Sequence, residues 1–173
     1  FAGGFPAKYG DKQSSVMDVT LREGNKKNHE IEAEANMAGI GIMMEGPILK
    51  NKASYMSSYK KSFLKYVIKS AGLQAVPEYW NGQTKIVYYF NPKEKLTFNL
   101  LLGDDEVQID DENRPDLRGA DHVDAKINQI TYGLTYKSLF SSKGYYQVTL
   151  ARNKSEWDNI VYNIIDGNKN VYY

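Results

Sequence analysis

The chain has 173 residues, which is enough for one domain of ordinary size. Lys and Arg total 22 and Asp and Glu total 21, so the charge is nearly balanced and gives no reason to expect nucleic-acid binding. The mean hydropathy is −0.56 and no run of about 18 apolar residues is present, which excludes a transmembrane helix but not a transmembrane β-strand.

The residue usage adds two further indications. The 14 tyrosines suit a membrane–water boundary, where the ring lies in the apolar layer and the hydroxyl stays hydrated. The absence of cysteine removes disulfides and thiolate metal sites. The chain begins at Phe1 without a charged and apolar targeting segment, as expected of a mature protein or of an internal part of a longer one.

In chain order, residues 1–25 lack the alternation of apolar and polar residues that marks the rest of the sequence. They contain GGFPAKYGD at 3–11, SSVMDVT at 14–20 and LREG at 21–24. We expect Ser15–Leu21 to form an isolated strand.

The alternation begins near residue 29 and predicts that 29–38 and 40–48 are antiparallel neighbours. One face of this pair is apolar and the other is acidic. The apolar residues are Ile31, Ala33, Ala35, Met37, Ile40, Ile42 and Met44; those on the other face include Glu30, Glu32, Glu34, Met43 and Glu45. Glutamates in a row are costly in a dry core, so their face must meet water or opposite charge.

Later segments repeat this pattern. Ser54–Val67 is predicted as a strand, because a helix would scatter its apolar residues, and Thr84–Phe90 follows as another. The clearest rows are Leu96, Phe98, Leu100 and Leu102 against Thr97, Asn99, Leu101 and Gly103, and Ile130, Tyr132, Leu134 and Tyr136 against Thr131, Gly133 and Thr135. A last segment carries Tyr146, Val148 and Leu150, which gives about seven strands after residue 28.

The connections between these strands alternate in length. Short ones are predicted at 49–53, 91–95 and 141–144, and long polar ones at 69–83 and 104–124, with a third opening near Asn153. Antiparallel strands joined in this way have their short turns at one end and their long loops at the other, as outer-membrane barrels do. Aromatic residues gather beside the short turns, which favours an interfacial girdle over β propensity alone.

Several stretches together resemble the TonB-dependent outer-membrane receptors. The Gly-x-Phe-Pro-Ala-x-Tyr-Gly turn, the Ser-Ser-Val-x-Asp-Val stretch and the Arg-Glu-Gly exit resemble the end of their plug domain. The Glu-Gly-Pro at 45–47 and SYMSSYKKSFL at 54–64 resemble their second and third barrel strands, with Lys60 and Lys61 where that family often has arginine. The match covers about the first 65 residues.

The resemblance implies a fold and a function. The fold is all-β: the antiparallel wall of a large, plugged transmembrane β-barrel, with residues 1–27 as the end of the plug and linker and 28–173 as the first part of the barrel. The chain is then a fragment of a receptor that imports a scarce ligand across the outer membrane of a Gram-negative bacterium. Its partners are outer-membrane lipid, the unidentified ligand and, through an upstream part of the plug, the energy-transducing protein TonB.

The candidate site consists of charged residues on the polar face. Facing the lumen, the carboxylates of Glu30, Glu32, Glu34 and Glu45 have Lys8 and Arg22 of the plug-like segment as prospective partners. These contacts would hold the plug in place. The alternative is that the glutamates only face water in a wet lumen.

No other motif carries chemistry. His29 and His122 have no partner at metal-ligand spacing, and the acidic run 104–124 lacks the spacing of a calcium loop, so a solvated loop is preferred to a Ca²⁺ site. We therefore expect no enzyme activity, no cofactor and no metal.

Two other functions remain open. One is a complete outer-membrane barrel of eight strands, with Ser14–Leu21 as the eighth, acting as an adhesin or structural protein. The other is a soluble lipid-binding barrel of the lipocalin type, in which the glutamate face would point outward.

Overall fold

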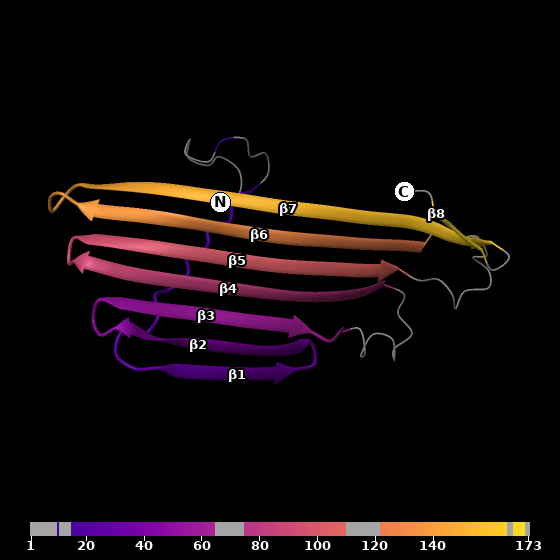
Figure 1. Ribbon diagram of the computed structural model, residues 1–173, viewed down its shortest axis with the longest axis horizontal. Coiled ribbons are helices and arrows are strands. Elements are labelled where there is room, and N and C mark those ends of the chain that lie inside the picture. The colour runs from indigo at the N-terminus through magenta and orange to yellow at the C-terminus, as the bar shows by residue number, and fades with distance from the viewer. Residues whose placement is uncertain (1–9, 11–14, 65–74, 110–121, 166–167, 172–173) are drawn as a thin grey trace.

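The computed structural model describes residue 10 and residues 15–64, 75–109, 122–165 and 168–171. Eight strands form one antiparallel sheet, in which each strand pairs with the next in the chain (Figure 1). The strands are β1 (Glu30–Asn36), β2 (Gly39–Leu49), β3 (Ala53–Ser62), β4 (Ala75–Asn91), β5 (Glu94–Ile109), β6 (His122–Leu139), β7 (Tyr145–Ile165) and β8 (Asn168–Val171). The predicted pairing of the first two strands, and of those flanking the turns near 92 and 142, is confirmed.

The register defines two faces, because residues directly opposite each other in antiparallel strands point to the same side. One, the polar face, includes Glu30, Glu32, Glu34, Met43, Glu45, Met56, Ser58, Lys85, Thr97, Asn99, Thr131 and Thr135. The other, the apolar face, includes Ile31, Ile40, Ile42, Met44, Tyr59, Ile86, Leu96, Phe98, Leu100, Leu102, Ile130, Tyr132, Leu134, Tyr136, Val148 and Leu150. The predicted grouping of the rows is confirmed.

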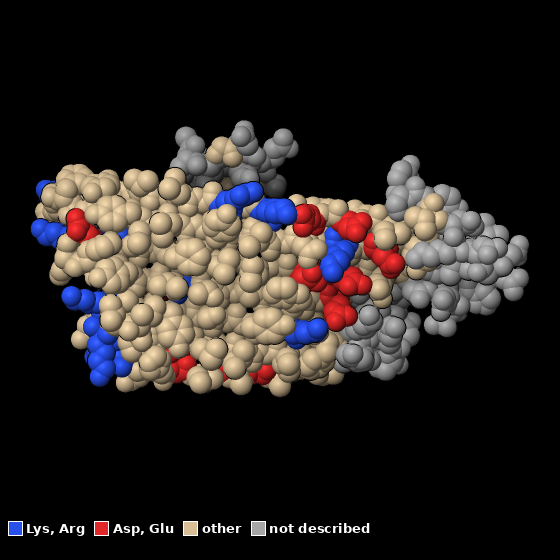
Figure 2. All heavy atoms as spheres, viewed as in Figure 1, with Lys and Arg blue, Asp and Glu red and all other residues tan. Residues whose placement is uncertain are grey.

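The sheet has almost no core of its own. Among the described residues only Ala53, Met56 and Val87 are buried apolar side chains. On the apolar face, by contrast, Ile31 is 71% exposed and Leu150 is 73% exposed. Figure 2 shows this face as a broad area without charge over the middle of the strands. No helix in the described part of the chain has the length and hydrophobicity to cross a membrane.

The short turns are stabilised locally. At the β2–β3 turn Asn51 has φ of 61°, a left-handed conformation that asparagine tolerates better than most residues. Between β1 and β2, the side chain of Asn36 accepts hydrogen bonds from the backbone N–H groups of Ala38 and Gly39 at 2.9 and 3.2 Å. Adjacent strands are therefore joined by turns that fix their register.

The strands are longer than the sequence predicted. The segments assigned to polar connections at 69–83 and 104–124 contain the start of β4 at Ala75, the end of β5 at Ile109 and the start of β6 at His122. No loop opens near Asn153, since β7 continues to Ile165. These predictions were wrong because backbone pairing continues beyond the last apolar residue, where both faces of the sheet carry polar side chains.

The prediction of about seven strands holds, since β1–β7 are followed, in the described part of the chain, only by the four-residue β8. One further prediction needs correction. Ser15–Leu21 is not a strand: Ser15 forms a single bridge, and residues 16–21 have no regular structure. Among the described residues β1 and β8 do not pair with each other, so they are the two edges of an open sheet.

Candidate functional site

Residues 15–29, here called the N-terminal segment, cross the polar face before β1 begins (Figure 1). Its charged residues and its backbone contact side chains of β2, β4 and β5. Successive side chains of a strand point to opposite faces of the sheet, so the polar side chains of these strands lie on one face. A segment that crosses this face therefore contacts carboxylates, lysines and a tyrosine. The candidate site is this contact between segment and sheet.

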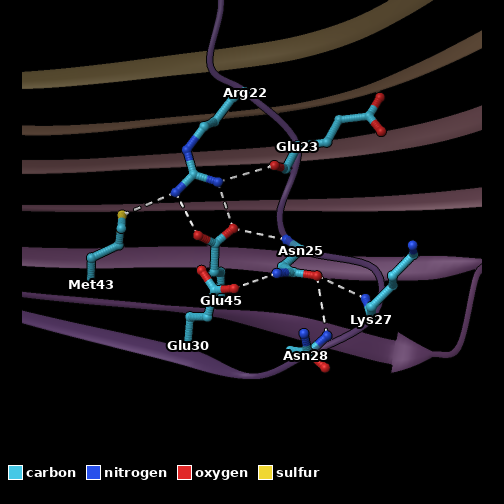
Figure 3. A network of polar contacts seen from close by, with 8 residues as sticks. All are labelled: Arg22, Glu23, Asn25, Lys27, Asn28, Glu30, Met43 and Glu45. Atoms are coloured by element: carbon cyan, nitrogen blue, oxygen red, sulfur yellow. Dashed lines mark hydrogen bonds and ion pairs between the residues drawn. The ribbon is translucent and has the colours of Figure 1, made fainter.

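The first part of the site is an ion pair between Arg22 and Glu45 (Figure 3). The Arg22 Nη1 and Nη2 atoms donate to the two carboxylate oxygens of Glu45 at 2.5 and 2.6 Å, in the paired geometry that makes arginine–carboxylate contacts strong. The backbone N–H of Asn25 also donates to Glu45, at 2.8 Å. The hydrogen bond to Glu45 raises the pKa of Arg22 above its usual value.

The two partners differ in their surroundings. The Glu45 side chain is 4% exposed, whereas that of Arg22 is 54% exposed. A buried carboxylate is stable only when its hydrogen-bonding capacity is met, and here Arg22 and the Asn25 backbone meet it. The contact is therefore more important for the buried carboxylate of Glu45 than for the exposed guanidinium of Arg22.

The second part of the site surrounds Glu23. Its carboxylate accepts hydrogen bonds from the Tyr89 hydroxyl at 2.9 Å and from the Lys95 ammonium at 2.9 Å, and it pairs with Lys26 at 3.0 Å. The Lys26 ammonium lies 4.1 Å from the centre of the Tyr89 ring. Burial alone would raise the pKa of Glu23, but the hydrogen bonds from Lys95, Lys26 and Tyr89 outweigh it and lower this pKa from 4.5 to about 2.

Backbone contacts complete the site. The Lys85 ammonium donates to the carbonyl oxygen of Leu21. Gly24 is buried against β3, and a β-carbon at this position would overlap the carbonyl oxygen of Tyr55. The close approach of segment and sheet therefore requires glycine.

The other predicted residues have different outcomes. Glu30 accepts a hydrogen bond from the Asn25 side chain at 2.5 Å (Figure 3), and Glu34 pairs instead with Lys60 of β3 at 2.5 Å. Glu32 influences Arg22 only through its charge, as far as the described residues go. Lys8 lies outside the described residues. The structure thus joins Arg22 to Glu45 directly and links the same segment to Glu30.

A hollow of about 210 Å³ lies on the polar face over β1–β4. Its lining is of mixed charge and includes Glu32, Glu34, Met43, Ser58, Lys60 and Gln83. The Nη2 of Arg22 lies 3.8 Å from the sulfur of Met43, so the hollow adjoins the Arg22–Glu45 pair. Within the described part of the chain, no group of His, Asp or Glu is arranged to hold a metal ion.

Glu23, Tyr89, Lys85 and Lys95 were not predicted as site residues. Their contacts span long separations in the chain, and an alternating pattern shows which face a residue is on but not what lies across it. One signal was present: the Arg22-Glu23-Gly24 sequence combines two opposite charges with a residue suited to close backbone approach.

No protein-family model matches the chain, and neither a curated protein nor a solved structure matches it.

Proposed function

We propose that this chain forms part of the wall of a transmembrane β-barrel receptor of the TonB-dependent class, which imports a scarce ligand across the outer membrane. The N-terminal segment is then the end of the plug, lying against the inner side of the wall. The observation that carries the proposal is the division of the sheet: the apolar face is uncovered, and the chain lies on the polar face instead.

The height of the apolar face supports its placement in a membrane. On β5 its apolar residues lie between Glu94 and Asp104, a length of about 33 Å at about 3.3 Å per residue. At a tilt of about 45° this length spans about 23 Å along the membrane normal, close to the apolar band of about 25 Å in known membrane barrels. On β6 the apolar row ends level with that of β5, at Ile130 opposite Leu102, whereas on β7 it ends earlier, at Leu150, because Arg152 lies opposite Tyr132.

The contacts of the N-terminal segment support a wide barrel. An eight-stranded barrel has an interior just large enough for its own side chains. The Arg22–Glu45 and Glu23–Tyr89 contacts instead hold a length of chain against the polar face. The strand count alone fits the small-barrel alternative, but the space for this segment favours the large plugged one. In a lipocalin-type barrel the uncovered apolar face would have to be the interior, opposite to where the segment lies.

The contacts with Arg22 and Glu23 also suggest how the segment is held. Two opposite charges next to each other in the chain bind partners on different strands, so the segment is fixed at two points. Ionic contacts of this kind hold a plug in place, yet release it without breaking a hydrophobic core. The proposal assigns lipid to the apolar face and TonB as the energy-transducing partner; the ligand stays unidentified.

Two adjacent leucines provide the test. Leu100 lies on the apolar face and Leu101 on the polar face. Leu100→Arg should impair assembly in the outer membrane of a Gram-negative host, because arginine facing lipid near the midplane costs about 2–4 kcal/mol. Leu101→Arg, the matched control, should be tolerated, as should Asn99→Arg. The measurement is the amount of protease-resistant protein in the membrane fraction, and equal amounts for Leu100→Arg and Leu101→Arg would overturn the proposal.

A further inference from the structure

The two ends of the sheet differ in charge. The short turns at residues 50–52, 92–93 and 140–144 contain Lys50, Lys52, Lys93 and Lys143, and the acidic residue beside them is Glu94, the first residue of β5. At the opposite end of β5–β7, acidic residues predominate: Asp104, Glu106, Asp124, Glu156 and Asp158. Figure 2 shows mainly basic side chains, with an acidic group among them, along the short-turn end and a mixed, largely acidic cluster toward the other end. The net charge of +1 therefore hides a strong separation of charge.

The short turns form one continuous edge, here called the basic rim. The backbone N–H of Tyr89 donates to the carbonyl oxygen of Lys52 at 2.7 Å, and that of Leu139 donates to Lys93 at 2.9 Å. Each turn is thus joined to the next hairpin along the sheet. The four turn lysines are exposed, and none forms an ion pair with an acidic residue in the described ranges.

Aromatic rings lie between the basic rim and the aliphatic part of the apolar face. The rings of Tyr88 and Phe90 are 4.9 Å apart, those of Phe90 and Tyr136 are 6.3 Å apart, and those of Tyr136 and Tyr146 are 5.9 Å apart. These contacts make a chain of rings across β4, β6 and β7. From the middle of the sheet to its edge, the order is aliphatic side chains, aromatic rings, then lysines, which matches hydrocarbon, interface and headgroups.

We propose that the basic rim binds the anionic headgroups of phospholipids in the leaflet that the short turns face. The inference rests on the proposed function, because it requires the apolar face to be in a bilayer. Lysines without acidic partners, placed at headgroup depth, attract negative lipids, and each is expected to contribute about fivefold in affinity near the surface. Mobile salt weakens the attraction, since charges are screened beyond about 8 Å at physiological ionic strength.

The experiment measures which lipid contacts the protein. The full chain is reconstituted in phosphatidylcholine vesicles with a trace of spin-labelled phosphatidylglycerol or spin-labelled phosphatidylcholine, and electron spin resonance gives the motionally restricted fraction of each label. We expect phosphatidylglycerol to be preferred several-fold. In the triple variant Lys50→Gln, Lys52→Gln and Lys93→Gln the preference should fall toward equal restriction of the two lipids, and in the unaltered protein it should weaken in high salt.

The matched control removes as many positive charges from the other half of the molecule. Lys61→Gln, Lys126→Gln and Lys154→Gln alter lysines that pair with Glu78, Asp104 and Glu156, and they should leave the preference unchanged. Circular dichroism verifies that both variants keep their strands. Equal restriction of the two lipids by the unaltered protein, or an equal loss in both variants, would overturn the inference. If neither label is restricted, the chain is not in the bilayer and the proposed function itself fails.

Discussion

At the scale of single residues, the site depends on a buried carboxylate and an exposed guanidinium. The Glu45 side chain is buried and accepts hydrogen bonds from Arg22 and from the Asn25 backbone. Arg22→Gln should therefore be more damaging than Glu45→Gln, because it leaves a charged carboxylate buried without its main partner. A partner lost from a buried pair costs about 3–5 kcal/mol, and the exposure of Arg22 reduces this to about 1–3 kcal/mol here.

The measurement is urea unfolding of each variant in the same detergent micelles. The double variant separates the pair from its surroundings: it should be less destabilised than the sum of the two single changes, since both partners of the contact are then absent. Additive effects, or a larger loss for Glu45→Gln, would contradict the assigned asymmetry.

Glu23 predicts a dependence on pH. Its pKa is lowered from 4.5 to about 2 by Lys95, Lys26 and Tyr89, which together outweigh burial. A carboxylate with a lowered folded-state pKa contributes stability above its ordinary value and loses it as the pH falls toward the folded value. Attachment of the N-terminal segment should therefore be complete above pH 4.5 and should weaken between pH 4.5 and about 2.

Because the chain has no cysteine, spin labels can be placed on Thr20→Cys and Thr131→Cys without background. The distribution of distances between the two labels should be narrow at neutral pH and should broaden as the pH falls from 4.5 toward about 2. The same labels in Glu23→Gln should give a broad distribution already at neutral pH. A variant whose distribution stays narrow would mean that Glu23 does not hold the segment.

At the scale of elements, the sequence predicted faces better than ends. Leu96–Leu102 and Ile130–Tyr136 alternate because one side meets apolar surroundings and the other does not, and the register agrees with both rows. The signal disappears beyond Gly103, where Asp104, Asp105 and Glu106 occupy both faces although the strand continues to Ile109. Backbone hydrogen bonds require no particular side chain, so the ends of these strands leave little trace in the sequence.

Only part of the candidate site could be predicted from the sequence. A row of glutamates required water or positive partners, so Arg22 was a prospective partner, but charge alone did not single out Glu45 among the four glutamates as the residue that it binds. The Glu23–Lys95 contact joins residues separated by 72 positions, and no local pattern specifies it. Glu34 of β1 pairs with Lys60 of β3, across Gly41 of the intervening β2, and this contact depends on the register of all three strands.

The prediction at the scale of elements concerns Gly24, where the N-terminal segment packs against β3. A methyl group at position 24 would overlap the backbone of β3 at Tyr55, so Gly24→Ala should push the N-terminal segment away from the sheet. We expect a loss of about 1–3 kcal/mol, as for other overpacked sites, and a longer distance between labels at positions 20 and 131. Gly103→Ala is the control, since a β-carbon there has no described atom within 4 Å. An unchanged distance in Gly24→Ala would show that the approach of segment and sheet is looser than described.

At the scale of the whole molecule, the described side chains leave one face of the sheet apolar and uncovered. Buried polar residues, among them Glu45, Ser54, Ser58, Ser62, Thr97 and Ser138, outnumber the three buried apolar ones in the described part of the chain. A water-soluble domain of this size normally hides most of its large apolar side chains. Here the N-terminal segment lies on the polar face, and Ile31, Ile42 and Leu150 stay exposed, so under the proposed function this face is stabilised by lipid.

This distribution predicts that folding depends on an apolar solvent. Each large apolar side chain that moves from water into hydrocarbon contributes about 1.5–3 kcal/mol, and the apolar face carries many of them across seven strands. We expect strand content by circular dichroism in detergent micelles or vesicles, and aggregation or loss of strand signal when detergent is diluted below its micelle concentration. Sedimentation in parallel distinguishes a folded monomer from an aggregate. A folded monomer in buffer without detergent would contradict the membrane assignment, because the apolar face would then be stable against water and a soluble barrel would be the better reading.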